Sequence, residues 1–496
     1  MRQIEQYRVF EMEVPAQTNA VFSLDDIQEE ISSFQAGEKH LIRFMPMKTG
    51  TWRYKLTQKN GVSDGSFLCL PAKDGNHGPV HACGMGFAYA DGTPYQPFGT
   101  TCYAWTHQPE DVRKQTLETL SNAPFNKLRM CVFPKHMIYS ENEPAYFPFV
   151  RRTDGSWDVS RPVEDFWRDF ETQLFRLDRL GIESDVILFH PYDRWGFAEL
   201  SREDSLHYLD YCVRRLGAYK NVWWSLANEY DLLLGKTEED WEAFADRLLR
   251  DDAKRHLRSI HNCCQPYPKR DWMTHVSLQT SAPRKALAMR SQYQLPVIVD
   301  EFGYEGDIEF SWGNLTAREF VNRAWTAVCS GAWPTHGETL LNAQEHLWWA
   351  KGGKLQGETK ERIRFLRDMM AALPGTPEPL IQPLNYDVNG TKVDEKQNPF
   401  VSAMMRLNET DRIAYMLEIT PTALKGENWQ LYYFGRGQSQ RVLLQLPENV
   451  SWTAEIIDTW EMKREEKQRG LKGNVRIDLG GTESMALLMI KEEELQ

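Results

Sequence analysis

Residues 221–231 read NVWWSLANEYD, and this stretch carries the clearest signal of the fold. Its first part is almost wholly apolar, which is typical of a strand buried on both faces of a parallel sheet. The apolar run then stops at Asn228 and Glu229. Residues 296–304, PVIVDEFGY, repeat this form, with a carboxylate at Glu301 closing the run. Because side chains at the carboxyl ends of the strands form the active sites of (β/α)8 barrels, the two stretches predict such a site.

The composition is that of a soluble globular protein with more than one domain. A chain of 496 residues exceeds one ordinary hydrophobic core, so we expect about two to four domains. The net charge of -12 argues against a nucleic acid or an anionic membrane as the main partner. The first residues, MRQIEQYRVFEMEV, lack the basic start and apolar core of a secretory signal, and no apolar run is long enough to cross a bilayer.

The 8 cysteines are scattered along the chain without the spacing of metal ligands. We therefore expect reduced thiols, a cytoplasmic location, and neither a metal nor another cofactor. For the adjacent pair Cys263 and Cys264 a redox role and simple packing both stay open, and packing is favoured.

Hydrophobic periodicity divides the chain into three parts. Residues 1–78 alternate apolar and polar positions in short runs separated by turns, which predicts an antiparallel, immunoglobulin-like β-sandwich. In residues 79–374 apolar strand-like runs alternate with amphipathic helical ones, the pattern of a repeated β/α unit. Residues 375–496 begin at a proline-rich linker and return to short strands, which predicts a second β-sandwich.

Eight strand-like runs in the central part predict an α/β fold, a (β/α)8 TIM barrel flanked by the two sandwiches. The runs cover residues 97–105, 126–133, 183–190, 222–229, 256–262, 271–279, 296–302 and 332–339. The helical segments cover residues 109–120, 163–180, 201–216, 238–255 and 317–328.

Two carboxylates that end facing strands can cleave a glycosidic bond. In a retaining hydrolase one carboxyl group donates a proton and the other, about 5 Å away, attacks the sugar. Glu229 ends the fourth predicted strand and Glu301 the seventh, and these strands face each other across the barrel mouth. Strand alternation turns Asp300 and Glu301 to opposite faces, so we expect Asp300 to be a supporting or ion-paired acid.

The motifs LANE and DEFG resemble the paired motifs of clan A of the retaining glycoside hydrolases, the 4/7 barrel superfamily. The resemblance implies that Glu229 is the acid/base, that Glu301 is the nucleophile and that Asn228 contacts the sugar 2-hydroxyl. Arg129 in KLRMCVF matches the arginine that this clan carries on strand two. The three-part layout also resembles bacterial multidomain members of the clan. The polar pocket lining of the clan has counterparts in His190 and His261.

Two positions depart from the clan pattern. The clan has a tyrosine on strand six that hydrogen-bonds the nucleophile, and here His275 or Gln279 would have to serve. For the tryptophan that the clan carries on strand eight, the candidates are Trp333 and Trp348.

Other residues after the strands are candidates for lining the sugar pocket. Aromatic rings in these loops can stack on sugar faces, and plain packing is an equal alternative for each of them. The ring candidates are Tyr304, Trp105, Trp195 and Trp312, and His336 is a further lining candidate.

These patterns predict a cytoplasmic, exo-acting, retaining glycoside hydrolase for β-linked oligosaccharides or glycosides. One alternative is a metal-dependent barrel hydrolase, although residues 100–103 lack the paired histidines that such enzymes carry on the first strand. The other is a non-catalytic carbohydrate-binding protein on a degenerate barrel, and the presence of both glutamates argues against it. We expect no nucleic-acid or membrane partner, and assembly into a homo-oligomer and the identity of the sugar stay open.

Overall fold

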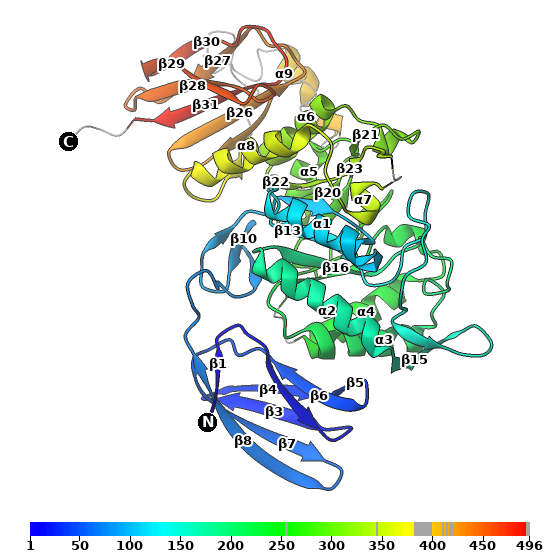
Figure 1. The fold of residues 1–496 in the computed structure, drawn as a ribbon. Helices are drawn as coiled ribbons and strands as arrows, with labels where there is room; N and C mark the ends of the chain where they lie inside the picture. The colour runs from blue at the N-terminus through cyan, green and yellow to red at the C-terminus, as the bar shows by residue number, and fades with distance from the viewer. Residues whose placement is uncertain are drawn as a thin grey trace. The chain divides into compact units, whose positions relative to one another are not determined.

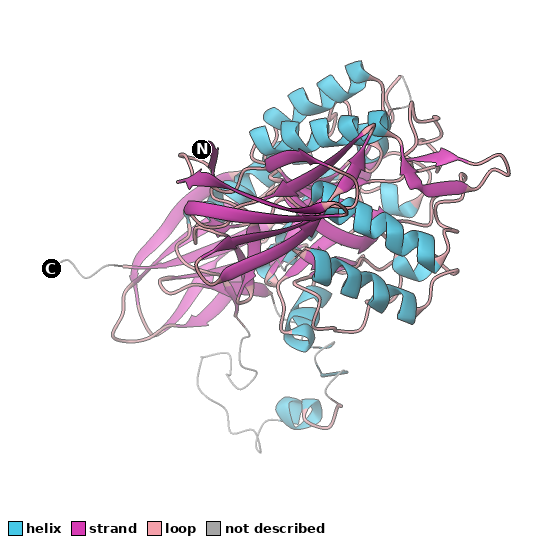
Figure 2. Cartoon of the chain, turned by 90° about the horizontal axis from the view of Figure 1, so that it is seen from below, coloured by secondary structure: helices cyan, strands magenta, loops and turns pink. Residues whose placement is uncertain are grey.

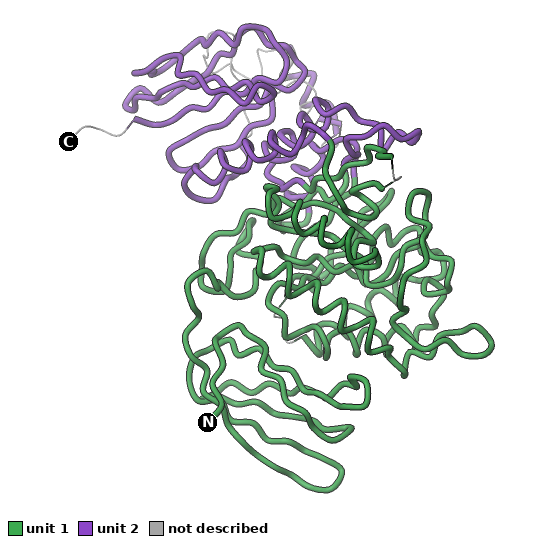
Figure 3. The backbone as a smooth tube through the Cα atoms, in the orientation of Figure 1, with its two compact units in different colours: residues 1–279, 293–301, 335–356 green, residues 280–292, 302–334, 357–496 purple. Residues whose placement is uncertain are grey.

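The computed structural model describes residues 1–252, 256–343, 346–380, 399–408, 411–412, 415 and 421–492. Contacts between residues divide the chain into two compact units (Figure 3). Unit 1 comprises residues 1–279, 293–301 and 335–356, and unit 2 comprises residues 280–292, 302–334 and 357–496. Because this division cuts through the central part of the chain, the predicted division into three domains stays a prediction.

The amino-terminal part of unit 1 consists of two sheets around one apolar core. In sheet order, the larger sheet contains β1 (Arg2–Glu5), β8 (Gly61–Leu70), β7 (Gly50–Gln58), β3 (Asn19–Leu24) and β4 (Ile27–Ser32). The smaller contains β2 (Phe10–Val14), β6 (Lys39–Phe44) and β5 (Phe34–Ala36). Phe10, Phe44 and Phe67 come from both sheets and pack together in the core. The pair β1–β8 is parallel, so the sandwich is not antiparallel throughout as predicted.

The central sheet is a parallel eight-stranded barrel, which confirms the predicted TIM barrel. In sheet order its strands are β18 (Arg258–Ser259), β17 (Val222–Ala227), β16 (Glu183–Phe189), β13 (Lys127–Cys131), β12 (Gly99–Thr101), β22 (Ala332–His336), β20 (Val297–Glu301) and β19 (Val276–Gln279). A parallel bridge between His261 and Ser277 joins the two ends of this order. Each strand lies within one of the eight predicted runs.

A small sheet that the sequence did not predict packs against the amino end of the barrel. It contains β9 (Val80–Cys83), β10 (Gly86–Tyr89) and β11 (Pro94–Tyr95). Phe87 of this sheet stacks on Trp223 of β17 with ring centroids 5.8 Å apart, and Tyr95 meets the same indole edge-on. The apolar residues at the start of β17 are therefore covered, and the carboxyl end of the barrel is left for a site.

Helices follow the strands as the β/α pattern requires (Figure 1). They are α1 (Glu110–Ser121), α2 (Glu164–Arg179), α3 (Arg202–Leu216), α4 (Glu238–Asp251), α5 (Lys285–Tyr293), α6 (Ala317–Cys329), α7 (Trp348–Lys351) and α8 (Thr359–Ala372). Ser201 and Thr237 cap α3 and α4 by accepting amide hydrogen bonds. The five predicted helices are present, and residues 253–255 of the predicted fourth one lie outside the described residues. No described helix is long and apolar enough to span a membrane.

The carboxyl-terminal part of unit 2 is again a pair of sheets, as predicted. The larger contains β24 (Glu378–Pro379), β25 (Thr422–Lys425), β26 (Trp429–Gly435), β31 (Met485–Lys491), β28 (Trp452–Asp458) and β29 (Lys463–Leu471), and the smaller contains β27 (Arg441–Gln445) and β30 (Asn474–Asp478). Leu444 and Ile477 of the smaller sheet share a core with Leu487 of the larger. In Figure 2 the strands of this part are magenta and the long helices of the central part are cyan.

Short elements occupy the loops. They are β14 (Phe149–Arg151), β15 (Trp157–Pro162), β21 (Glu305–Gly306), β23 (Glu338–Thr339), α9 (Pro399–Met404) and the 3-10 turns Trp105–His107, Tyr230–Leu232 and Ser311–Gly313.

Candidate active site

Glu229 lies directly after β17, where the backbone is held on both sides. The amide of Asn228 donates to the carbonyl of Phe189, and the amide of Tyr230 donates to the carbonyl of His261, both at 2.9 Å. Between these two anchors Glu229 has a φ of 49°, in the left-handed region that non-glycine residues rarely adopt. Such a conformation costs about 1–3 kcal/mol and is concentrated at functional sites.

Three donors surround the Glu229 carboxylate. The hydroxyl of Tyr192 donates to Oε2, and the side-chain amide of Asn228 donates to the same oxygen at 3.2 Å. The amide of Gln279 donates to Oε1 at 3.1 Å. A tyrosine hydroxyl can donate a hydrogen bond to a carboxylate and can also accept one from a carboxyl O–H.

Glu301 ends β20 and faces three groups of its own. The hydroxyl of Tyr103 donates to its Oε1. Nη1 of Arg129 donates to the same oxygen at 3.4 Å, and Nε2 of His261 lies 3.8 Å from it. A cation and a hydroxyl donor both favour the ionised carboxylate.

Asn228 and Tyr103 join the two glutamates into one hydrogen-bonded site. The Tyr103 hydroxyl that bonds Glu301 lies 3.0 Å from Oδ1 of Asn228. The same Asn228 oxygen accepts from Nη2 of Arg129 at 3.1 Å, and the Asn228 amide bonds Glu229. The hydrogen-bonded path from the Glu229 carboxylate to the Glu301 carboxylate therefore passes through two side chains, those of Asn228 and Tyr103.

Below the glutamates a set of buried charges fills the barrel. Nζ of Lys127 donates to Asp185 at 2.8 Å and to Asp300 at 2.7 Å. Asp300 also accepts from Ser277 at 2.5 Å and from Thr335 at 2.8 Å. Burial alone would raise the pKa of Asp300, but Lys127 and the neighbouring guanidinium hold it well below its usual range. Asp300 is thus an ion-paired acid, as strand alternation predicted.

Arg129 connects this buried layer to the site. Its Nε lies 3.6 Å from Asp185 and 3.8 Å from Asp300, while its Nη atoms reach Asn228 and Glu301. Although its side chain is fully buried, the surrounding acidic groups keep the pKa of Arg129 well above its usual value. The guanidinium therefore stays charged.

Lys135, in the loop after β13, is a site residue that the sequence gave no reason to select. Its side chain is only 3% exposed. Its Nζ lies 3.7 Å from the ring centroid of Tyr103 and 4.4 Å from those of Tyr192 and Trp349. Burial lowers the pKa of Lys135 to about 8, although Glu229 and other acidic neighbours oppose that shift.

The two predicted pocket histidines are buried and neutral. Burial lowers the pKa of His190 to about 3, and its Nε2 lies 3.2 Å from the carbonyl of Phe133. Burial and the charge of Arg129 hold the pKa of His261 well below its usual value. Of the two, His261 lies beside Glu301, so it alone is placed to take part in the site directly.

The structure corrects the expected hydrogen-bond partner of Glu301. His275 packs edge-on against Phe87 and Trp223 at the amino end of the barrel, and Gln279 bonds Glu229 instead of Glu301. Tyr103, after the first strand, makes the hydrogen bond that the clan pattern places on strand six.

The predicted tryptophan and histidine of strand eight are also corrected within unit 1. Trp348 is buried and donates to Thr100 at 2.8 Å, whereas the adjacent Trp349 meets the Tyr103 ring edge-on at 5.8 Å. His336 packs on Phe125 with ring centroids 4.7 Å apart, so it belongs to the barrel packing.

Three of the four predicted stacking rings, those of Trp105, Trp195 and Tyr304, are buried, and Trp312 is partly exposed. Trp105 is completely buried, and its indole nitrogen lies 3.2 Å from the sulfur of Met130. The indole N–H of Trp195 donates a hydrogen bond to the carboxylate of Glu143 at 2.9 Å. Tyr304 is 1% exposed and packs edge-on against Trp312 within unit 2.

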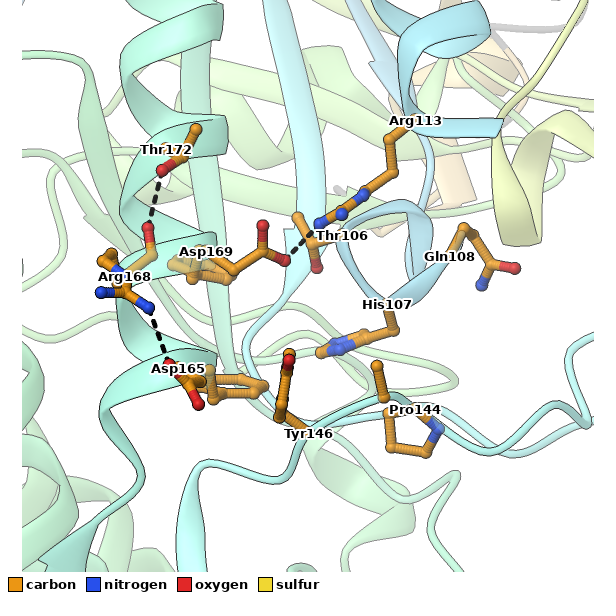
Figure 4. Close-up of a pocket in the computed structure, with 13 residues that line it drawn as sticks. Thr106, His107, Gln108, Arg113, Pro144, Tyr146, Asp165, Arg168, Asp169 and Thr172 are labelled. Atoms are coloured by element: carbon orange, nitrogen blue, oxygen red, sulfur yellow. Dashed lines mark hydrogen bonds and ion pairs between the residues drawn. The ribbon is translucent and has the colours of Figure 1, made fainter. Parts of the chain in front are cut away.

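A separate cavity of about 370 Å³ lies beside α2 and does not include either glutamate (Figure 4). Its two arginines are already paired, because Arg113 bonds Asp169 and Arg168 bonds Asp165 at 2.7 Å. With its cations neutralised and no carboxylate pair facing an open centre, this cavity is not the candidate catalytic site.

Barrel glycoside hydrolases carry a pair of carboxyl groups at the carboxyl ends of their strands, and the two linked glutamates fit that arrangement. The model of the apiosidase-like catalytic domain matches residues 84–374, well over half of the chain. The chain therefore belongs to the apiosidase-like family and is a glycosidase. Residues 419–490 match a domain of unknown function, DUF5605.

Solved structures agree with this assignment. A candidate glycoside hydrolase from Bacteroides vulgatus is 32% identical, with a TM-score of 0.85, over 99% of this chain and 100% of the other. A family 5 glycoside hydrolase from the same organism shares the fold, with 13% identity and a TM-score of 0.60 over 84% of this chain and 94% of the other. No curated protein matches the chain.

Proposed function

We propose that the chain is a retaining glycosidase that removes a terminal sugar, with Glu229 as acid/base and Glu301 as nucleophile. The observation that carries the proposal is the hydrogen-bonded path from Glu229 through Asn228 and Tyr103 to Glu301. Two carboxylates from facing strands that share such a short path can reach the two sides of one anomeric carbon.

In the first step the Glu301 carboxylate attacks the anomeric carbon while Glu229 donates its proton to the leaving oxygen. The bond to the leaving group breaks and a covalent glycosyl–enzyme ester forms. In the second step the ionised Glu229 takes a proton from water, and that water attacks the same carbon and releases Glu301. The sugar leaves with the anomeric configuration it had in the substrate.

The neighbours of the two carboxylates fit these different tasks. Arg129 and Tyr103 hold Glu301 ionised and fixed between turnovers. Glu229 contacts amides and a hydroxyl, whose lone pair can accept from Glu229 once it carries the proton. Asn228, between them, is placed to bond the sugar hydroxyl next to the anomeric carbon, as the clan resemblance implies.

The depth of the site supports exo action on a short substrate. Glu229 is 5% exposed and the Glu301 side chain 13% exposed, so a terminal sugar can enter more easily than a continuous polymer. The family name makes apiosides the first substrates to test. Apiose is a neutral branched sugar that forms furanosides, and β-linked apiosides are the form we propose.

Metal-dependent hydrolysis is less well supported by the charges of the site. Arg129 lies 3.4 Å from Glu301. The Lys135 ammonium lies over the ring of Tyr103, whose hydroxyl bonds Glu301. These two cations would oppose a divalent metal ion between the glutamates.

The test is a panel of aryl glycosides that includes β-apiofuranosides, with product configuration followed by NMR. The proposal predicts release of the sugar with retained configuration, and loss of turnover in both Glu229→Gln and Glu301→Gln. Glu143→Gln is the matched control, because Glu143 bonds Trp195 and Arg194 instead of the site. Inverted product, or near-normal turnover in either site variant, would contradict the assigned roles.

A further inference from the structure

We propose that Lys135 is a sugar-binding residue that donates hydrogen bonds to the hydroxyl oxygens of a neutral glycosyl unit between Glu229 and Glu301. This inference rests on the proposed function and assigns the kind of sugar that the site accepts.

The position of Lys135 is fixed by its surroundings. The amide of the next residue, His136, donates to the carbonyl of Tyr192 at 2.8 Å, which ties the lysine loop to the loop after β16. Three aromatic rings, from Tyr103, Tyr192 and Trp349, then enclose the ammonium. The first two of these rings carry the hydroxyls that bond Glu301 and Glu229, and the charges of both carboxylates act on the ammonium.

The ammonium has donors but no acceptor. Within the described ranges no hydrogen bond or ion pair is formed by its Nζ, although the residue is only 3% exposed. Aromatic faces attract a cation but offer no lone pair to its N–H groups. The protein buries most of this side chain and offers its N–H groups no acceptor, so a ligand that enters the site can supply oxygens for them.

The charges of the site favour a neutral ligand. The cations Lys127 and Arg129 balance the anions Asp185 and Asp300 in the layer below. When Glu229 carries the proton that the mechanism requires, Lys135 balances Glu301. A neutral sugar preserves this balance, whereas the carboxylate of a uronic acid would add an unbalanced buried charge.

Several titratable groups surround the ammonium, and they determine how its binding depends on pH. They are Tyr103, Arg129, Cys131, His190, Tyr192, Glu229, His261 and Glu301. The histidines are neutral at physiological pH, so the carboxylates and Arg129 are the charges that act on Lys135 there.

The experiment measures sugar binding by titration calorimetry, with apiose and other neutral monosaccharides against glucuronic and galacturonic acids. We expect the native protein to prefer neutral sugars, and Lys135→Met to weaken their binding by about 10- to 100-fold, the effect of hydrogen bonds to a charged group. In Lys135→Ala, added methylammonium should enter the ring cage and restore part of the binding. Lys236→Met is the matched control, because Lys236 is half-buried but donates to Leu200 and Ser205, and it should leave sugar binding unchanged.

Binding of neutral sugars that is equal in the native protein and Lys135→Met would overturn the inference. Preference for uronic acids, or no binding of any neutral sugar, would overturn it as well. Calorimetry measures binding and does not need turnover. If Glu301→Gln were active, the proposed catalytic roles would be wrong, but the measured effect of Lys135→Met on sugar binding would still test the role of Lys135.

Discussion

Two buried lysines near the same strand have opposite surroundings. Lys127, on β13, has its ammonium between Asp185 and Asp300 at 2.8 and 2.7 Å. Lys135, in the loop after β13, has three aromatic rings and no acceptor within the described ranges. A charge whose partners are all supplied by the fold stabilises the fold, whereas a buried charge left without an acceptor is available to a ligand.

The adjacent acids Asp300 and Glu301 repeat the contrast. Asp300 belongs to the layer of buried charges below the glutamates and has Lys127, Ser277 and Thr335 as hydrogen-bond partners. Glu301 belongs to the candidate active site above that layer. One step along a strand changes the face and therefore the role. The variants below break or sharpen this division between the layer of buried charges and the candidate active site.

The largest expected effect is on turnover in Glu301→Gln. The amide keeps the shape of the side chain but cannot form the ester, so kcat should fall by at least about 10⁴-fold with the melting temperature nearly unchanged. Kinetics on the best aryl glycoside and a thermal melt check both parts. A large decrease in melting temperature would mean that Glu301 stabilises the fold, as Asp300 does.

The next effect is on stability in Lys127→Met. Removing this ammonium leaves Asp185 and Asp300 buried without their shared cation, which should lower the free energy of unfolding by about 3–5 kcal/mol. Urea unfolding measures it. The matched variant is Lys135→Met, which removes an unpaired ammonium and should cost far less stability. Equal losses in the two variants would remove the distinction between the lysines.

A smaller effect is expected for Tyr103→Phe. The change removes one hydroxyl that bonds Glu301 and approaches Asn228, so kcat should fall by about 10- to 100-fold. Tyr304→Phe is the control, because that ring packs within unit 2. If the two variants had the same kcat, the hydrogen bond from Tyr103 to Glu301 would not contribute to turnover.

The smallest effect is a pH dependence that Lys135 should impose. With its pKa lowered to about 8, the ammonium is charged below that pH, so sugar binding should weaken as the pH rises through about 8. Between about 8 and its usual pKa the unfolded chain holds the proton that the folded chain has lost, so this lysine's contribution to stability should rise with pH. Both trends should disappear in Lys135→Met, and trends that persist there would have to come from another group.

The sequence was sufficient for the barrel because each of its strands lies in an apolar run between helical patterns. It was insufficient for α5, a short helix whose apolar residues do not keep to one face. The sequence also did not predict that β1 and β8 pair in parallel, because hydrophobic periodicity does not report the direction of pairing. It did not predict the small sheet β9–β11 because strands of a few residues give little periodic signal.

The candidate site divides in the same way. Glu229, Glu301 and Arg129 could be predicted because each is polar at the end of, or within, a buried strand. Tyr103 and Lys135 could not, because their importance comes from contacts between loops far apart in the chain. Trp105 and Trp195 lie buried against Met130 and Glu143, because a ring that follows a strand can pack inside the protein as readily as it can line the mouth. All eight cysteines are unpaired, including Cys263 and Cys264, and the cytoplasmic location stays a prediction.

The most direct test of the paired-glutamate mechanism is to trap the intermediate. Glu229→Gln, incubated with an aryl glycoside that has an activated leaving group, can still form the ester on Glu301 but cannot readily activate water to hydrolyse it. Peptide mass spectrometry should find one glycosyl unit on the peptide that contains Glu301. A glycosyl unit on another residue, or an unmodified protein that still releases the aryl group, would contradict the mechanism.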